Sequence, residues 1–388
     1  MTSIDLIAAT AFGLEAVTIR ELQALGYEAK GSQPGHVVFR GDPSAICRAN
    51  LWLRSADRIL IRMAEFPAED FDQLFDRTNA VPWEQWLPID ADFPVNGRSI
   101  RSRLSSVPAC QRSVKKAIVR RLLTAYRRGG SAGKSLRLSE TGPRYTIELI
   151  LRNDVATLCI DTTGPSLHKR GYRTLVGGAP LKETLAAALV MLSFWKPQRR
   201  LIDPFCGSGT IPIEAALIGR NLAPGLNREF AAESWPQIPA RSWDAARQEA
   251  RDLVRPVFQP GIIGTDIDPA ALRLARSNAE RAGVASLIHF QQQPFEQLAS
   301  RDTHGILIAN PPYGQRLGDD RETEHLYSSI SRVLARLDTW SWYILTSYPD
   351  LEKRLSRLAD RRRKLYNGRI ACTYYQFHGP RMPRREPS

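Results

Sequence analysis

Short runs in which apolar and polar residues alternate are separated by helical patterns over the first 65 residues. Alternation with a period of two is typical of strands, whereas apolar residues that recur every three or four positions are typical of helices. Strands are predicted at 5–10, 37–40 and 58–65, and helices at 14–25 and 43–51. This order predicts a small α+β unit of ferredoxin type over residues 1–65.

A second unit is predicted over residues 66–161. Its main helix is expected at 111–128, because apolar residues recur every four positions from Val114 to Tyr126. Extended segments are expected at 92–96, 99–104, 145–151 and 156–161, with an Asn-Asp turn between the last two.

The rest of the chain has the pattern of a doubly wound domain. Residues 162–181 are rich in Gly, Thr and Arg and are interpreted as a linker. A helix is expected at 182–195, and from Leu201 apolar strands alternate with helices. This alternation predicts an α/β fold with a parallel sheet over residues 182–380, followed by a polar C-terminal tail at 381–388.

The charge of the chain indicates a class of partner. There are 54 Lys and Arg against 40 Asp and Glu, a formal net charge of +14, which favours polyanions. Between Arg98 and Arg144 there are thirteen basic residues and one acid, Glu140. A solvated helix face usually mixes charges of both signs, so a phosphate-binding surface is favoured over that alternative. The candidate contacts to nucleic acid are Arg98, Arg101, Arg103, Arg112, Lys115, Lys116 and Arg120, with Lys169 and Arg170 in the linker.

The cysteines and histidines do not have the spacing of metal ligands. The five cysteines lie at 47, 110, 159, 206 and 372, far from the two- to four-residue spacing of zinc sites, and no metal is expected. A chain of this size needs no disulfides, so a reducing, cytoplasmic compartment is expected. No signal peptide is expected, nor a run of about 18 apolar residues that would predict a membrane span.

The strongest motif joins an apolar strand to a glycine turn. Residues 201–210 read Leu-Ile-Asp-Pro-Phe-Cys-Gly-Ser-Gly-Thr, with the strand ending at Asp203. Glycines in such a turn let a ligand approach the main chain closely. Pro212 stands where nicotinamide-binding turns have a third glycine, and the acid before the turn suits a cationic ligand. S-adenosylmethionine carries an ammonium and a sulfonium group and fits this pattern.

Another strand, predicted at 261–266, ends in acids. Asp266 is expected to accept hydrogen bonds from the ribose hydroxyls of the cofactor. Asp268 and Pro269 are instead interpreted as the N-cap and the first residue of a helix. Gln293 is a weaker candidate for the adenine amine.

The apolar run at 305–309 leads into Asn-Pro-Pro-Tyr at 310–313. An exocyclic amine is a poor nucleophile because its lone pair is delocalised into the ring. The side-chain oxygen of Asn310 and the carbonyl of Pro311, which Pro312 holds rigid, could accept from its N–H groups and orient it. Tyr313 could stack on a base that has left its helix. The alternative is an ordinary turn, but the position downstream of two cofactor motifs favours a catalytic site.

The order of these motifs resembles the amino-methylating class of S-adenosylmethionine-dependent enzymes. More narrowly, residues 161–173, 179–189 and 223–236 resemble the THUMP-domain ribosomal RNA guanine-N2 methyltransferases of the RlmL type. The resemblance implies α+β ferredoxin-like and THUMP domains that bind RNA, followed by a Rossmann-like methyltransferase domain. It implies transfer to guanine N2 in large-subunit (23S) ribosomal RNA, with S-adenosyl-L-homocysteine as the product. The implied cofactor contacts are Asp203, Pro204, Phe205, Gly207, Gly209, Thr210, Asp266, Ile267, Gln293 and Asn310, and the implied catalytic residues are Asn310, Pro311, Pro312 and Tyr313.

Three departures from the family pattern affect these expectations. Asp203 and Asp266 are 63 residues apart, so residues 221–259 form an insertion, for which a place in the RNA site is a hypothesis. Gln replaces the usual acid before the Asn-Pro-Pro-Tyr strand, and no second methyltransferase domain is expected. Transfer RNA, protein glutamine and DNA adenine are alternative substrates, and an RNA-binding module with an inert second half is an alternative of another class. The motifs do not distinguish guanine N2 from adenine N6, and they do not predict an oligomeric state.

Overall fold

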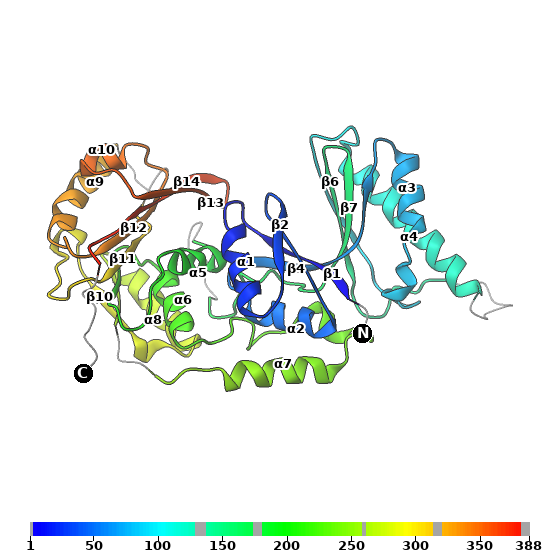
Figure 1. Cartoon of the computed structure of the whole chain (residues 1–388), viewed down its shortest axis with the longest axis horizontal. Coiled ribbons are helices and arrows are strands. Elements are labelled where there is room, and N and C mark those ends of the chain that lie inside the picture. Colours follow the sequence, from blue (N-terminus) through cyan, green and yellow to red (C-terminus); the bar gives the residue numbers. More distant parts are fainter. Residues whose placement is uncertain (1–2, 129–136, 174–180, 258–260, 313–319, 382–388) are drawn as a thin grey trace.

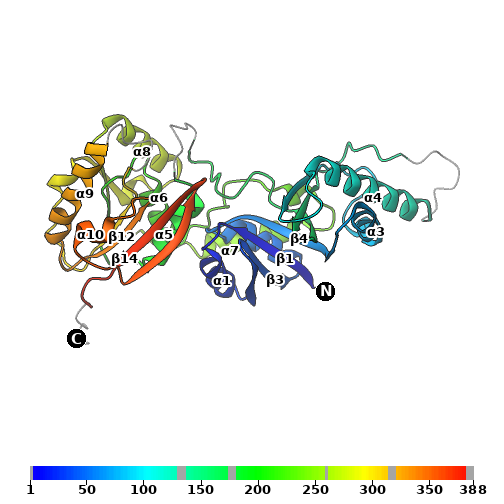
Figure 2. The same ribbon diagram turned by 90° about the horizontal axis from the view of Figure 1, so that it is seen from above.

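Two seven-stranded sheets organise the described part of the chain (Figure 1). The computed structural model describes residues 3–128, 137–173, 181–257, 261–312 and 320–381. The catalytic sheet and the THUMP region lie at opposite ends of an elongated molecule, with the ferredoxin-like region between them (Figures 1 and 2). None of the helices in these ranges is both long and apolar enough to span a membrane.

The N-terminal sheet has the strand order β2-β3-β1-β4-β7-β6-β5. Its strands are β1 (Ile4–Thr10), β2 (Ala29–Gln33), β3 (His36–Gly41), β4 (Ala56–Pro67), β5 (Val95–Ile100), β6 (Thr146–Arg152) and β7 (Val155–Asp161). The helices of this half are α1 (Glu15–Ala24), α2 (Pro43–Trp52), α3 (Phe71–Ala80) and α4 (Val107–Arg128), with a short 3-10 helix η1 (Trp83–Gln85). Helices α3 and α4 cover the side of the THUMP strands that faces away from the catalytic sheet (Figures 1 and 2).

Strand β4 belongs to both N-terminal units. Its first part pairs with β1, where Leu6 lies opposite Ile61, and its second part pairs with β7, where Phe66 lies opposite Ala156. The ferredoxin-like and THUMP units therefore share one sheet, in which the pairing of β4 with β7 shifts register between Arg62 and Ala64.

The sequence pattern missed two elements of this half. Strand β2 reads Ala-Lys-Gly-Ser-Gln and has no apolar face, so only its pairing with β3 identifies it. Helix α3 buries only Leu74 and Thr78, although the Asp70 side chain caps it by accepting from the Gln73 N–H. The two extended segments expected at 92–104 are one strand, β5, which pairs in parallel with β6.

The catalytic sheet has the order β10-β9-β8-β11-β12-β14-β13. Its strands are β8 (Leu201–Asp203), β9 (Ile262–Asp266), β10 (Ile288–Gln292), β11 (Ile306–Ala309), β12 (Ser341–Thr346), β13 (Arg361–Asn367) and β14 (Ile370–Phe377). Its helices are α5 (Glu183–Leu192), α6 (Thr210–Gly219), α8 (Pro269–Arg281), α9 (Asp320–Ala335) and α10 (Leu351–Leu355). The first five strands in this order are parallel, and β14 is antiparallel to both of its neighbours. Apolar residues of α5, α6 and α8 cover one face, and those of α9 and α10 cover the other. The predicted Rossmann-like arrangement is confirmed.

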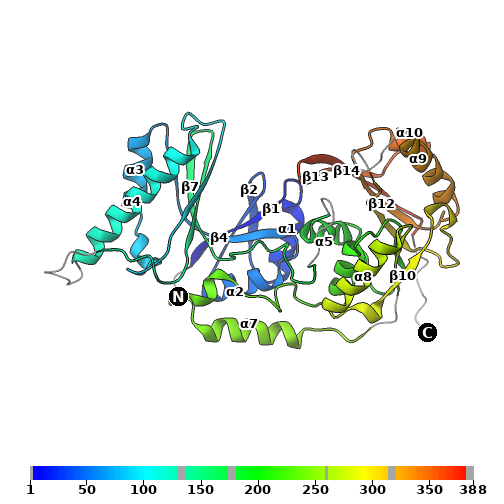
Figure 3. The same cartoon turned by 180° about the vertical axis from the view of Figure 1, so that it is seen from behind.

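The described part of the insertion, residues 221–257, packs mainly against the N-terminal half, with Leu222 at its start packed against the core of the catalytic domain. It leaves and rejoins the catalytic domain at one point, where the Arg255 N–H donates to the Arg220 carbonyl at 2.8 Å. Its helix α7 (Ala240–Asp252) runs beside α2 along the lower edge of the molecule (Figure 3). Trp235, 1% exposed, stacks on Tyr145 of the THUMP unit with ring centroids 4.3 Å apart. The aromatic residues of this segment, which the sequence analysis placed in a hypothetical RNA site, are instead buried and join the two halves.

Candidate active site

Three strand ends meet at the point where the strand order reverses. Strand β8 lies between β9 and β11, so Asp203, Asp266 and Asn310 follow three neighbouring parallel strands. The register pairs Leu307 with Ile202, which places Asn310 two residues beyond the level of Asp203. Strand spacing and rise put the two backbones roughly 8 Å apart. Open α/β sheets bind their ligands at this kind of position.

The glycine turn has the conformation that its sequence requires. Gly207 has φ +50° and Gly209 has φ +80°, both in the left-handed region. A Cβ on Gly207 would meet nothing within 4 Å, so this side of the turn is open to a ligand. A Cβ on Gly209 would lie 3.0 Å from the Ala275 side chain, so the turn packs closely against α8. Pro204 is buried beside the turn, and Thr210 begins helix α6.

Two carboxyl groups flank the turn. One oxygen of Asp266 accepts from the Gly207 N–H at 2.8 Å and the other accepts from the Asp268 N–H at 3.0 Å. Each carboxylate oxygen keeps a second lone pair, so both can still accept from ribose hydroxyls. Asp203 is 1% exposed, and burial raises its pKa well above the ordinary value, with Asp266 adding to the effect. A bound cation would favour the charged form of Asp203, and this fits a cofactor that carries an ammonium group.

The surroundings of the expected adenine site combine an exposed aliphatic side chain with stacked rings. Ile267 is 68% exposed although it follows a buried strand. Phe205 stacks on Phe295 with centroids 4.9 Å apart. The Gln293 side-chain N–H donates to the Gln297 carbonyl at 2.9 Å, which leaves its oxygen as an acceptor for an amine. These residues fit S-adenosylmethionine, with Gln293 still an expectation for the adenine amine. Asp268 caps α8 by accepting from the Ala270 N–H at 2.8 Å, as predicted.

Asn310 has an unused acceptor beside the glycine turn at 207–209. This turn is called the cofactor turn below, because S-adenosylmethionine is expected to bind there. Its side-chain oxygen is buried and has no hydrogen-bond partner in the described part of the chain. Pro311 is buried and Pro312 is half-buried, and they continue the chain from the end of β11. Tyr313 lies outside the described residues. Because an unpaired buried oxygen costs free energy, Asn310 is suited to receive an N–H group from a ligand.

Sequence reasoning missed a residue that supports the turn. The buried side chain of Asn278 on α8 donates to the Ser208 carbonyl at 3.0 Å. Arg173 bonds the hydroxyl of Thr210 at the start of α6 and so ties the linker to the cofactor turn. A polar residue on the buried face of an amphipathic helix is the signal that could have identified Asn278.

The candidate nucleic-acid contacts of the THUMP unit differ in their surroundings. Arg112, Lys116 and Arg120 have exposed side chains on α4. Lys115 turns inward, where it donates to the Phe93 carbonyl at 3.1 Å and pairs with Glu140 at 2.8 Å.

The remaining candidates of this unit are exposed and precede α4. The Arg98 guanidinium bonds His36 at 2.9 Å, and Arg103 pairs with Glu69 at 2.5 Å. Arg101 lies in the loop after β5 with φ +51°.

One linker candidate for RNA binding is buried, so the prediction was wrong for this residue. The side chain of Arg170 is 2% exposed and pairs with the fully buried Glu214 at 3.1 Å. Its guanidinium also donates to the Arg54 carbonyl at 2.7 Å. Arg170 therefore joins the linker to α6 and does not face RNA, whereas the neighbouring Lys169 is exposed.

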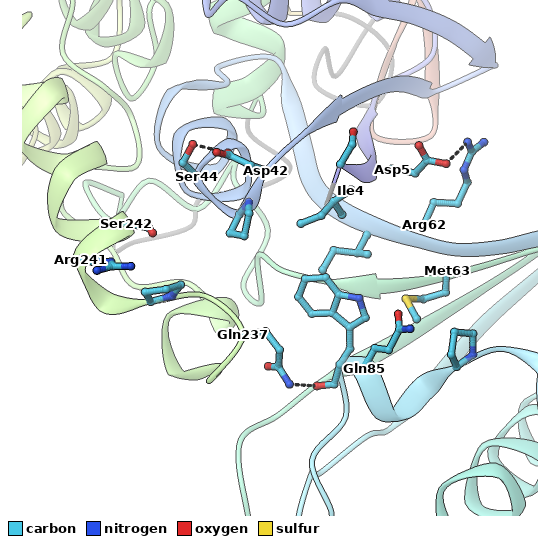
Figure 4. A pocket seen from close by; sticks show the side chains of 16 residues that line it. Ile4, Asp5, Asp42, Ser44, Arg62, Met63, Gln85, Gln237, Arg241 and Ser242 are labelled. Atoms are coloured by element: carbon cyan, nitrogen blue, oxygen red, sulfur yellow. Dashed lines mark hydrogen bonds and ion pairs between the residues drawn. The ribbon is translucent and has the colours of Figure 1, made fainter. Parts of the chain in front are cut away.

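A cavity of about 810 Å³ lies elsewhere, between the two N-terminal units and the insertion (Figure 4). Some of the polar side chains that line it are paired with neighbouring groups of the lining. Asp5 pairs with Arg62 at 3.0 Å, Asp42 accepts from Ser44 at 2.5 Å, and Gln237 donates to the Trp86 carbonyl at 2.8 Å. None of the strand-end residues lines this cavity. No group of three or more His, Cys, Asp or Glu in the described ranges could hold a metal ion.

Comparisons with known proteins agree with this geometry. The model of the RMKL-like methyltransferase domain matches residues 170–376, the RlmL ferredoxin-like domain matches 5–60, and the THUMP domain matches 68–161. YpsC of Bacillus subtilis (strain 168), a presumed RNA methyltransferase, is 46% identical over 386 residues, 100% of this chain and 99% of YpsC.

Two further relatives extend the comparison. Ribosomal RNA large subunit methyltransferase K/L of Syntrophotalea carbinolica is 37% identical over 94% of this chain, which spans about half, 52%, of that protein. The crystal structure of SMU.472, a presumed methyltransferase in complex with SAH, has a TM-score of 0.92 and 43% identity, covering 99% of this chain and 100% of that one. This chain therefore belongs to the RMKL-like methyltransferase family, with RlmL-type ferredoxin-like and THUMP domains before an S-adenosylmethionine-dependent catalytic domain.

Proposed function

We propose that this enzyme methylates the N2 amine of a guanine in large-subunit ribosomal RNA. The observation that carries the proposal is the buried, unpartnered side-chain oxygen of Asn310 beside the cofactor turn. A THUMP domain and the exposed cations of α4 support RNA as the substrate. The name of the K/L relative supports ribosomal RNA of the large subunit.

The residues of this chain bind and orient the reacting amine. The Asn310 side-chain oxygen and the Pro311 carbonyl accept from its two N–H groups, which turns the nitrogen lone pair toward the cofactor. The cofactor supplies an electrophilic methyl group when bound. Asp266 and the glycine turn hold it at the neighbouring strand ends, so the enzyme contributes alignment of two bound groups. The proposal needs no nucleophilic cysteine, and burial raises the pKa of the Cys206 thiol in the glycine turn well above its ordinary value.

Other amines fit the same acceptor pair. Adenine N6 and the side-chain amide of protein glutamine both present an NH2 group, and transfer RNA is a further RNA substrate. The exposed basic side chains of α4 favour nucleic acid over a protein substrate. All five cysteines are buried and none of them forms a disulfide, which supports a reducing, cytoplasmic site of action.

Mapping of modified nucleotides tests the substrate. Ribosomal RNA from cells with and without the gene is digested, and methylated nucleosides are located by mass spectrometry. We expect one N2-methylguanine of the large-subunit RNA to be absent from the deletion strain. Loss of a methyl group only from transfer RNA or from a protein would refute the proposal.

Asn310→Ala tests the amine-binding role. We expect turnover to fall by more than about a hundredfold, because an acceptor that aligns the nucleophile is lost. Cofactor affinity, measured by calorimetry, should stay within a few fold. Asn278→Ala is the matched control, since it removes a hydrogen bond to the cofactor turn and should weaken cofactor binding instead. Near-normal turnover of Asn310→Ala would contradict this account of the site.

A further inference from the structure

The basic helix α4 lies far from the strand ends that hold the cofactor. It is at the opposite end of the molecule, on the outer side of the THUMP strands (Figures 1 and 2). RNA bound only there is not held next to the target base. A flipped-out base leaves neighbouring nucleotides that need their own contacts near Asn310. Within the described part of the catalytic sheet, the β13–β14 hairpin offers such contacts.

The strand register places this hairpin beside the active site. Ala309 pairs with Ile344, Thr346 pairs with Thr373, and Thr373 pairs with Lys364. Across the sheet, Lys364 is therefore level with Pro311, the second residue after Ala309. Three strand spacings separate these two backbone positions, which is roughly 14 Å. Tyr366 lies two residues further along the strand, beyond the carboxyl edge of the sheet. Both side chains are on one face of β13, because residues two apart on a strand share a face.

An aromatic residue of the ferredoxin-like unit joins this face. Phe12, in the loop before α1, is 47% exposed, and its ring meets that of Tyr366 edge-on with centroids 5.9 Å apart. The Lys364 ammonium lies 5.8 Å from the Tyr366 ring centroid. The hairpin ends beside this loop in Figures 1 and 3. Two units of the protein thus contribute to one group of two rings and a cation, in which Phe12 and Lys364 are exposed and Tyr366 is half-buried.

The loop that carries Phe12 is fixed in place. Gly13 has φ +88°, and a Cβ there would lie 2.6 Å from the Lys364 carbonyl oxygen, so the loop packs tightly against β13. The Glu15 carboxylate accepts from the N–H groups of Gly13 at 2.9 Å and of Gly35 at 2.7 Å. Leu14, the next residue, is buried in the same core as Leu365. Phe12 is therefore presented by a rigid loop.

The charge around these rings favours a polyanion. Strand β13 begins Arg-Arg-Arg-Lys, and Arg369 is exposed at the hairpin turn. Arg362 pairs with Glu352 at 2.9 Å. Exposed rings that accept bases, with cations for the phosphates, are the usual elements of single-strand binding. A folded protein or a membrane would need a larger apolar patch than two rings provide.

We propose that Phe12, Lys364 and Tyr366 form a stacking platform that binds the unpaired nucleotides next to the target base. The inference rests on the proposed function, because it takes the base at Asn310 to be part of an RNA strand. One ring stacks on a base, and the Lys364 ammonium pairs with a phosphate. The platform holds the strand beside the active site while α4 holds a distant part of the same RNA.

The test compares five variants of the full-length enzyme with the wild type, and one of them, Lys364→Ala, removes the cation of the platform. Phe12→Ala and Tyr366→Ala each remove a ring, and Tyr366→Phe keeps the ring without the hydroxyl. Arg361→Ala is the matched control, because it removes an exposed cation from the opposite end of β13. Two quantities are measured: kcat/KM on ribosomal RNA from the deletion strain, and the Kd of a fluorescent single-stranded RNA 12-mer of mixed sequence. Cofactor Kd and thermal stability are measured in parallel.

We expect each ring removal to lower kcat/KM and RNA affinity by about 5- to 150-fold, the range for one stacked base. Tyr366→Phe and Arg361→Ala should stay within about threefold, and cofactor Kd should not change. Lys364→Ala should reduce the slope of log Kd against log salt by about 0.7, as for one phosphate of a single strand. If the ring variants match Arg361→Ala in both assays, the platform inference is wrong. If the wild type methylates no RNA while the ring variants still lose 12-mer binding, the proposed function fails, and only the part of the inference that these rings bind single-stranded RNA stands.

Discussion

Trp235→Ala tests whether the insertion joins the catalytic domain to the N-terminal half. Trp235 is 1% exposed and stacks on Tyr145, and its indole N–H donates to the Arg144 carbonyl at 3.0 Å. It also meets Trp86 edge-on at 6.3 Å. The substitution removes all three contacts from one buried position.

The expected loss follows from these contacts. Truncation of a buried Trp to Ala costs about 3–5 kcal/mol. The aromatic pairs add about 0.5–1.5 kcal/mol. We therefore expect the insertion to lose about 4–6 kcal/mol of local stability. Trp235→Phe keeps the stacking and loses the hydrogen bond to the Arg144 carbonyl, so about 1–2 kcal/mol is expected.

Native-state hydrogen exchange measures this loss without assuming two-state unfolding of the whole chain. In Trp235→Ala, amides of α7 and β6 should exchange about a thousandfold or more faster, with a tenfold change for each 1.4 kcal/mol. Cofactor affinity should stay within a few fold, because Trp235 belongs to the N-terminal core and the cofactor turn packs in another core. RNA affinity should fall as the THUMP unit loosens.

Two results would refute this reasoning. Unchanged exchange in α7 would mean that the insertion is held by other contacts. A loss of cofactor affinity as large as the loss of RNA affinity would mean that the insertion supports the catalytic sheet itself.

The remaining predictions concern charged residues. Asp203→Asn should weaken cofactor binding yet stabilise the protein at neutral pH. Folding raises the pKa of Asp203, so the wild type loses stability as the pH rises from the ordinary pKa of an aspartate through the raised pKa of the folded state. Thermal unfolding against pH should show this fall in the wild type and not in the variant. Arg170→Ala should cost about 3–5 kcal/mol in urea unfolding, because Glu214 would be left buried without its partner, and the salt dependence of RNA binding should not change. Lys116→Ala should leave the stability unchanged. It should reduce the slope of log Kd for RNA against log salt concentration by about 0.7–0.9.

The sequence predicted the catalytic domain well because its signals are local. Each strand end carries its candidate site residue within a few positions, and strand order follows from the doubly wound pattern. The pairing of β8 with β9 and β11 then brings Asp203, Asp266 and Asn310 together.

The insertion and Arg170 could not be placed in the same way. Trp235 and Tyr145 are 90 residues apart and stack only in the folded chain. Arginine is a residue type that often binds phosphate. Only the position of Glu214 in the fold shows that Arg170 belongs to an internal ion pair. The charges along a sequence indicate a possible partner, whereas the burial of each charged side chain decides whether the partner can reach that side chain.

The shared strand β4 has a consequence for substrate selection. Because strand β4 serves both N-terminal units, they share one sheet, and the docked insertion and the Phe12 loop join the catalytic domain to the same body. A substrate with two contact points must then present them at one separation and one angle. Lengthening the RNA duplex between those points by a few base pairs would place the target nucleotide out of reach, so the enzyme would choose its site by distance as well as by base identity.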